Sequence, residues 1–96
     1  MTTTPETPFG WTLTANGLQK TVILKDFAEA LAFVVAVGRI AESAHHHPDI
    51  DIRWNQVLLT LLTHSEGKVT QADYDLAEII NGLSADTVRE ASQRLW

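Results

Sequence analysis

The sequence contains no cysteine, which excludes a disulfide framework and a thiolate metal site. Positive charge is also scarce, because seven lysine and arginine residues stand against twelve aspartate and glutamate residues, for a formal net charge of −5. Binding to nucleic acid requires a basic surface that neutralises phosphates, so this balance argues against a nucleic-acid partner. It argues equally against attachment to an anionic membrane surface.

Long hydrophobic runs are missing as well. The most apolar stretch, residues 27–41, is interrupted by Glu29, Gly38 and Arg39, and it is shorter than the roughly 20 residues of a membrane span. The first residues show neither the basic segment nor the apolar segment of a signal peptide. We therefore expect no membrane partner and a cytoplasmic location, which the absence of cysteine also fits.

The length of 96 residues fits a single domain. A domain of this size buries only roughly 60–65% of its unfolded surface, so its stability is marginal without further support. With no cysteine available, oligomerisation is the remaining common route to that support. We expect residues 1–9, which are rich in threonine and proline, to form a flexible tail, and residues 10–96 to form one domain.

The first half of the domain predicts a hairpin followed by a helix. Residues 11–14 alternate apolar and polar side chains, as a half-buried strand does, and residues 18–24 are rich in β-branched side chains. Asn16-Gly17 between them predicts a tight turn. Residues 27–44 carry apolar side chains at intervals of three and four, after an acidic capping pattern, which predicts a largely buried helix.

The second half is predicted to contain two strands followed by two helices. Residues 50–54 and 56–63 are predicted as strands, residues 72–80 as a helix, and residues 84–96 as an amphipathic helix. The element order is β-β-α-β-β-α-α. Hairpins joined to helices indicate an α+β fold, a four-stranded antiparallel sheet with helices packed on one face.

All four histidines lie close to predicted element ends. Three are consecutive, from His45 to His47, and His64 lies at the end of a predicted strand. One interpretation is a solvated polar loop. Another is a metal site, but adjacent loop histidines do not have the spacing of common zinc motifs, so no metal is expected. The third is acid–base catalysis, because imidazoles can donate and accept protons near neutral pH.

Spacing distinguishes between these interpretations. The histidines belong to a longer pattern, Glu42-x-x-x-His46-His47-Pro48, then Trp54, His64 and Asp73, with the continuous segment HHPDIDIRWNQV inside it. This pattern resembles that of the pterin-4a-carbinolamine dehydratases, and the resemblance extends from about residue 11 to residue 80.

The resemblance implies a fold, an activity and an assembly. It implies an antiparallel sheet with helices on one side, and a homodimer or homotetramer. The implied reaction removes water from a 4a-hydroxytetrahydropterin to give the quinonoid dihydropterin, which recycles the pterin cofactor of aromatic amino-acid hydroxylation. The implied enzyme needs no metal and no organic cofactor.

Roles for individual residues follow from the same resemblance. His46 and His64 are expected to be the acid–base pair, and His47 is expected to join them in the site by binding substrate. Glu42 is spaced to orient a histidine. Asp73 has two interpretations, an active-site carboxylate or a capping group in the first turn of its helix.

Two further residues of the pattern are expected to contribute to substrate binding rather than to proton transfer. Trp54 can line the pterin pocket, although a strand aromatic more often belongs to a core or an interface. Pro48 can contribute to substrate binding by setting the loop.

The ends of the chain depart from the family pattern. Gly10-Trp11 is present, but the residues before it do not form the helix that usually leads the family fold, and we hypothesise that residues 83–96 replace it. Two other functions stay open, a non-catalytic binding or assembly protein on the same fold and an enzyme for a different hydroxylated heterocycle.

Overall fold

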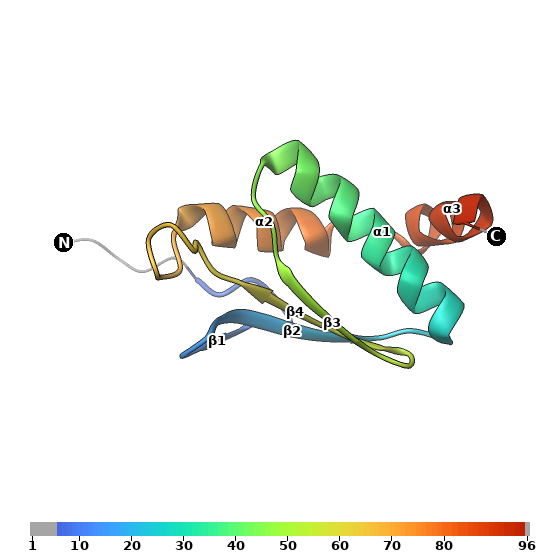
Figure 1. Cartoon of the computed structure of the whole chain (residues 1–96), viewed down its shortest axis with the longest axis horizontal. Helices are drawn as coiled ribbons and strands as arrows, with labels where there is room; N and C mark the ends of the chain where they lie inside the picture. Colours follow the sequence, from blue (N-terminus) through green and yellow to red (C-terminus); the bar gives the residue numbers. More distant parts are fainter. Residues whose placement is uncertain (1–5, 96) are drawn as a thin grey trace.

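Residues 6–95 form a four-stranded antiparallel sheet with three helices on one face (Figure 1), which confirms the predicted class and element order. The structure is a computed structural model that describes residues 6–95, so the first five residues of the expected tail lie outside it. The strands are β1 (Thr12–Thr14), β2 (Gly17–Ile23), β3 (Asp49–Arg53) and β4 (Gln56–Leu61). The helices are α1 (Phe27–Ala44), α2 (Gln71–Asn81) and α3 (Ala85–Leu95). None of the helices described is long and apolar enough to cross a membrane.

The strands lie in the order β1-β2-β4-β3, and every neighbouring pair is antiparallel. The tight turn predicted at Asn16-Gly17 joins β1 to β2, where Gly17 pairs with Thr14 and has a positive φ of 133°. A Cβ at Gly17 would lie 2.4 Å from the carbonyl oxygen of Leu61. Glycine is therefore required both by the backbone conformation and by the approach of β4.

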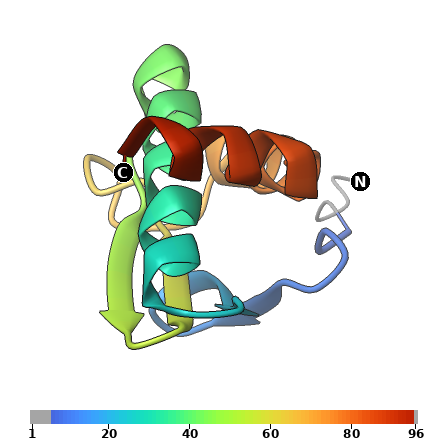
Figure 2. The ribbon, with the colours of Figure 1, turned by 90° about the vertical axis from the view of Figure 1, so that its right-hand side faces the viewer.

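The core lies between the sheet and the helices. Alternate residues of β2 and β4 face the helices, as the period of two in a strand requires. The sheet and α1 contribute side chains that are buried almost completely, among them Leu18, Val57, Leu59, Leu61, Ala30, Phe33 and Val37. The opposite face of the sheet has no helix over it within residues 6–95 (Figure 2).

Helix α1 begins and ends with capping contacts that determine where the chain goes next. The Asp26 side chain accepts a hydrogen bond from the Glu29 N–H at 2.9 Å, which caps the first turn. After Ala44 the chain turns at His45, whose φ of 52° is left-handed. The His46 N–H then donates to the Ala41 carbonyl at 3.2 Å. This end of the helix directs the following residues toward the start of β3.

Two strand ends differ from their predicted positions. Strand β3 ends at Arg53, so the prediction that Trp54 belongs to it is wrong, because Trp54 turns with a left-handed φ of 55°. Asn55 anchors that turn, since its carbonyl accepts from the Leu24 N–H at 2.8 Å and its side-chain amide donates to the Leu24 carbonyl at 3.1 Å. Strand β4 ends at Leu61 rather than residue 63. Alternation in the sequence follows side chains and does not detect a change in φ.

Asn81, at the end of α2, ties the start of the domain to its helices. Its side-chain oxygen accepts from the Trp11 indole at 3.0 Å and from Lys20 Nζ at 2.9 Å. Its amide donates to the carbonyl of Phe9 at 2.9 Å. Pro8 is buried, and residues 6–10 form no helix. Part of the expected tail is therefore held against α2.

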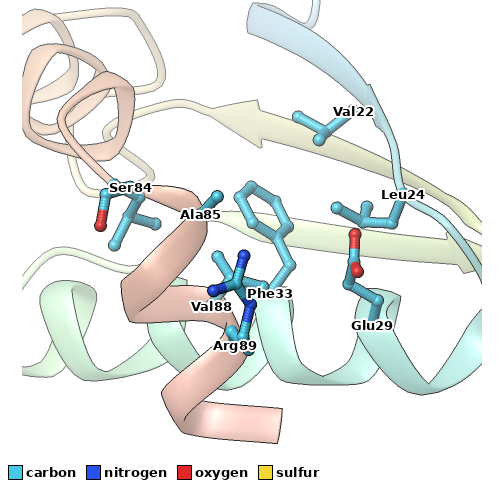
Figure 3. Close-up of a pocket in the computed structure, with 9 residues that line it drawn as sticks. Val22, Leu24, Glu29, Phe33, Ser84, Ala85, Val88 and Arg89 are labelled. Carbon is cyan, nitrogen blue, oxygen red and sulfur yellow. The ribbon is translucent and has the colours of Figure 1, made fainter.

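Helix α3 lies across α1 (Figure 2) and buries Val88 and Ala91. A cavity of about 260 Å³ lies where α3 starts, between α1 and the end of β2. Figure 3 shows Phe33, Val88 and Leu24 around it, with Glu29 and Arg89 at its polar margin. None of the four histidines lines this cavity, so it does not coincide with the residues that carry acid–base chemistry.

Candidate active site

Two connections bring the predicted site residues together. One joins α1 to β3 and carries His46, His47 and Pro48, and the other joins β4 to α2 and carries His64. They meet because Asp49 and Thr60 are partners in the β3–β4 ladder, so the start of β3 lies beside the end of β4. The sheet order therefore forms the site from two segments that are separate in sequence.

His46 and Asp73 form the most buried contact of the site. His46 Nε2 lies 2.5 Å from Asp73 Oδ1, and the Asp73 side chain is completely buried whereas that of His46 is 17% exposed. The other carboxylate oxygen, Oδ2, accepts from the Thr70 N–H at 2.8 Å, which makes Asp73 part of the capping of α2. The two oxygens of Asp73 thus have different partners: Oδ2 caps α2, as one interpretation of the sequence expects, and Oδ1 contacts His46.

His47 is paired with Glu42, the carboxylate expected to orient a histidine. Their Nε2 and Oε1 atoms lie 2.7 Å apart. The reversal of the chain after α1 brings these two residues together although they are five positions apart. Both side chains are largely exposed, His47 by 62%, so the pair is open to a ligand and its electrostatic energy is screened by water.

His64 is paired with a residue that the sequence did not single out. Its Nε2 lies 3.6 Å from Asp49 Oδ1, and its side chain is 63% exposed. Asp49 directly follows Pro48, but only the pairing of β3 with β4 shows that it faces His64. The signal for Asp49 in the sequence is its position directly after the His-His-Pro segment. Only the strand order shows which histidine it faces.

Each of the three motif histidines therefore has its own carboxylate. A carboxylate that accepts from one imidazole nitrogen fixes the ring and leaves the second nitrogen for other partners. His46 is the most enclosed of the three, and His47 and His64 are accessible from solvent. Imidazole nitrogens in this region can serve as proton donors or as acceptors.

The structure does not bring Trp54 to the histidines of its own chain. Strand β3 runs from Asp49, at the site, to Arg53, so Trp54 lies at the far end of the strand, where it is 64% exposed. A hydrogen bond from its neighbour Arg53 to Asp51, at 3.0 Å, raises the pKa of the Arg53 guanidinium. Pro48 is half-buried and lies in the α1–β3 connection, between His47 and Asp49 in the chain.

Comparisons with known proteins agree on one family. A family model described as pterin 4 alpha carbinolamine dehydratase matches residues 2–83. A relative from Roseiflexus sp. (strain RS-1), named "Putative pterin-4-alpha-carbinolamine dehydratase", is 54% identical over 72 residues, which are 75% of this chain and 77% of the relative. A relative of the same name from Nostoc sp. (strain PCC 7120) is 51% identical over 75 residues, 78% of this chain and 81% of the relative.

A solved structure shares the fold. It is described as a transcriptional coactivator/pterin dehydratase from Brucella melitensis, and it superposes with a TM-score of 0.70 at 33% sequence identity. The match covers 76% of this chain and 80% of that chain. Helix α3 begins at residue 85, after the end of the family match at residue 83.

Proposed function

The chain belongs to the pterin-4a-carbinolamine dehydratase family, and we propose on this basis that it dehydrates a 4a-hydroxytetrahydropterin to the quinonoid dihydropterin. The observation that supports this most directly is the cluster of three histidines, each beside its own carboxylate. In the host, this reaction would recycle a pterin cofactor after hydroxylation of an aromatic amino acid.

The reaction requires two proton transfers at neighbouring atoms of the pterin ring. The bond between the ring carbon and its hydroxyl breaks, and the oxygen leaves as water after it receives a proton. The neighbouring ring nitrogen loses its proton, and its electrons form the new carbon–nitrogen double bond. One acid and one base balance the reaction without any external oxidant or reductant, and imidazoles suit both roles near neutral pH.

We assign the base to His46 and the acid to His64. When Nε2 of His46 donates to Asp73, its Nδ1 carries the lone pair, and the residues that the structure describes form no hydrogen bond to that nitrogen. His64 is largely exposed, so a bound pterin can reach it, and its Nε2 lies 3.6 Å from Asp49 Oδ1. His47, paired with Glu42, supports binding of the pterin, and Pro48 shapes the loop that carries it.

A partner-binding function is the second candidate. The Brucella protein is described as a transcriptional coactivator/pterin dehydratase, and a fold does not by itself determine one function. A pure binding module would keep its partner after any histidine of the cluster is replaced by alanine, because binding to a surface elsewhere needs no imidazole.

The assembly and the location are further proposals. We propose a homodimer or homotetramer, supported by the small domain and by a mostly apolar groove on the outer side of α1 and α2, lined by Arg39, Ile40, Ser43, Ala44 and Ile79. Light scattering of the purified protein measures the number of copies. A cytoplasmic location stays a prediction from the sequence.

The activity is tested by following dehydration of 4a-hydroxytetrahydropterin generated in place. We expect the wild type to accelerate the reaction and both His46→Ala and His64→Ala to lose on the order of 10²-fold or more in kcat. His45→Ala is the matched control, because His45 is consecutive with the motif histidines but lies at the helix cap. A folded wild type with no rate above background would reject the dehydratase.

A further inference from the structure

The hydroxyl of Thr63 lies between two other groups of the site. Thr63 Oγ1 is 2.7 Å from Asp73 Oδ2 and 2.7 Å from Thr70 Oγ1. Asp73 Oδ2 also accepts from the Thr70 N–H, at 2.8 Å. The carboxylate that holds His46 through Oδ1 is therefore held through Oδ2 by two donors from the β4–α2 connection.

The directions of these hydrogen bonds are determined by the number of protons available. An ionised carboxylate only accepts, so the single proton of the Thr63 hydroxyl points to Asp73. The contact between the two hydroxyls must then be donated by Thr70. The chain of donors runs from Thr70 through Thr63 to Asp73, and His46 donates to the same carboxylate from the opposite side.

The backbone of Thr63 is held on both sides. Its N–H donates to the Lys68 carbonyl at 3.0 Å, and its carbonyl accepts from the N–H groups of Glu66 and Gly67 at 3.0 and 2.9 Å. A β-branched side chain on a fixed backbone has few rotamers, so the hydroxyl has a defined position. Thr63 is thus a rigid support for Asp73.

The capping of α2 does not require the hydrogen bond from the Thr63 hydroxyl to Asp73. The bond from the Thr70 N–H to Oδ2 satisfies the start of α2. The last torsion of an aspartate side chain is soft, however, so a single donor on Oδ2 holds the plane of the carboxylate, and with it the direction of Oδ1, less firmly than two donors do. A second donor on Oδ2 fixes that plane and keeps Oδ1 facing His46.

We propose that Thr63 is a positioning residue for the dehydration. By fixing the carboxylate of Asp73, it holds His46 in the tautomer with the proton on Nε2 and directs the Nδ1 lone pair toward the substrate. The kinetic part of this inference rests on the proposed function, whereas the tautomer of His46 is measurable without any substrate.

The test compares Thr63→Val, which keeps the shape and loses the hydroxyl, with Thr63→Ser, which keeps the hydroxyl. Thr21→Val is the matched control, because Thr21 is an exposed threonine of β2 on the uncovered face of the sheet. The measurements are the ¹⁵N chemical shifts of His46, which identify its tautomer, together with kcat, KM and the melting temperature.

We expect Thr63→Val to convert His46 from one tautomer to a mixture and to lower kcat with little change in KM. Outer partners of functional imidazoles in metal sites contribute on the order of 10- to 100-fold in activity, and we expect a loss near the lower end of this range. Thr63→Ser should keep the wild-type tautomer of His46 and the wild-type kcat, and Thr21→Val should resemble the wild type. Should Thr63→Val not fold, Thr63→Ala, which also lacks the hydroxyl, replaces it with the same expectation.

A folded Thr63→Val or Thr63→Ala protein with the wild-type tautomer would overturn the positioning role, even if its melting temperature falls. An inactive wild type whose His46 tautomer still depends on the Thr63 hydroxyl would reject the dehydratase and retain the positional coupling. The two failures are therefore distinguishable.

Discussion

Asp73 and His46, 27 positions apart in the sequence, are joined by a hydrogen bond of 2.5 Å that leaves the carboxylate fully buried and the imidazole partly open. The same carboxylate caps α2 through its second oxygen. One side chain therefore connects the fold of a helix to the orientation of a histidine. Changes at Asp73 should affect stability and activity together, which separates it from the exposed members of the site.

Asp73→Asn should show this combined effect. The amide keeps the shape but loses the charge, and hydrogen bonds to charged groups contribute about 1.5–3 kcal/mol to stability. We expect a lower melting temperature and a loss on the order of 10²-fold in kcat. Asp75→Asn, in the same helix but on an exposed aspartate bonded to Gln71, should be close to wild type. Equal behaviour of the two variants would contradict the role of Asp73.

His47→Ala and His64→Ala should separate activity from stability. Both imidazoles are largely exposed, and surface pairs of this kind contribute about 0–1 kcal/mol. We expect the free energy of unfolding of each variant to lie within roughly 0.5 kcal/mol of the wild-type value. His64→Ala should lower kcat, whereas His47→Ala should mainly raise KM. Steady-state kinetics with varied pterin concentration measures both, and a change in KM alone for His64→Ala would exclude it as the acid.

Asn81→Ala should destabilise the fold without impairing catalysis on folded protein. The substitution removes the partner of the Trp11 indole and of Lys20, and also the donor to Phe9. Leaving such groups without partners costs about 1–3 kcal/mol. Asn81→Asp is the informative comparison, since it keeps the acceptor oxygen and should retain more stability. Urea unfolding measures the difference, and equal stability of the two variants would contradict the role of the oxygen.

Deletion of residues 83–96 tests the proposal that the C-terminal helix replaces the family's leading helix. Helix α3 buries Val88 and Ala91 against α1, so its removal exposes part of the core around Phe33. We expect a lower melting temperature for the truncated chain. Val88→Ala should reproduce part of the effect, about 1–2 kcal/mol, and Arg94→Gln, on the exposed side, should not. An unchanged melting temperature after deletion would reject the proposal.

Local patterns in the sequence predicted most of the fold. The helix at residues 27–44 was predicted with the bounds that the structure has, because its periodicity is long and its cap is explicit. The spacing of Thr70 and Asp73 is an equally explicit capping pattern, and it predicts the capping role of Asp73. The end of β3 was missed because Trp54 continues the alternation of Ile50 and Ile52 while its backbone already turns.

The site was predicted less completely, because it depends on which strands are neighbours. Asp49 and His64 meet through the pairing of β3 with β4, and Thr63 reaches Asp73 across the β4–α2 connection. Periodicity reports which face a side chain occupies, but it does not report the order of strands in a sheet. Contacts of this kind become visible only in three dimensions.

The central position of β4 gives the two halves of the site different protection from solvent. Strand β4 is hydrogen-bonded to β2 and β3, whereas β3 pairs with β4 alone among the strands that the structure describes. Amide protons of β4 should therefore exchange with deuterium more slowly than those of β3. Thr63 and His64 follow the protected strand, while His47 and Pro48 precede the edge strand. Local opening would release the loop of His46 and His47 first and leave the segment of His64 in place.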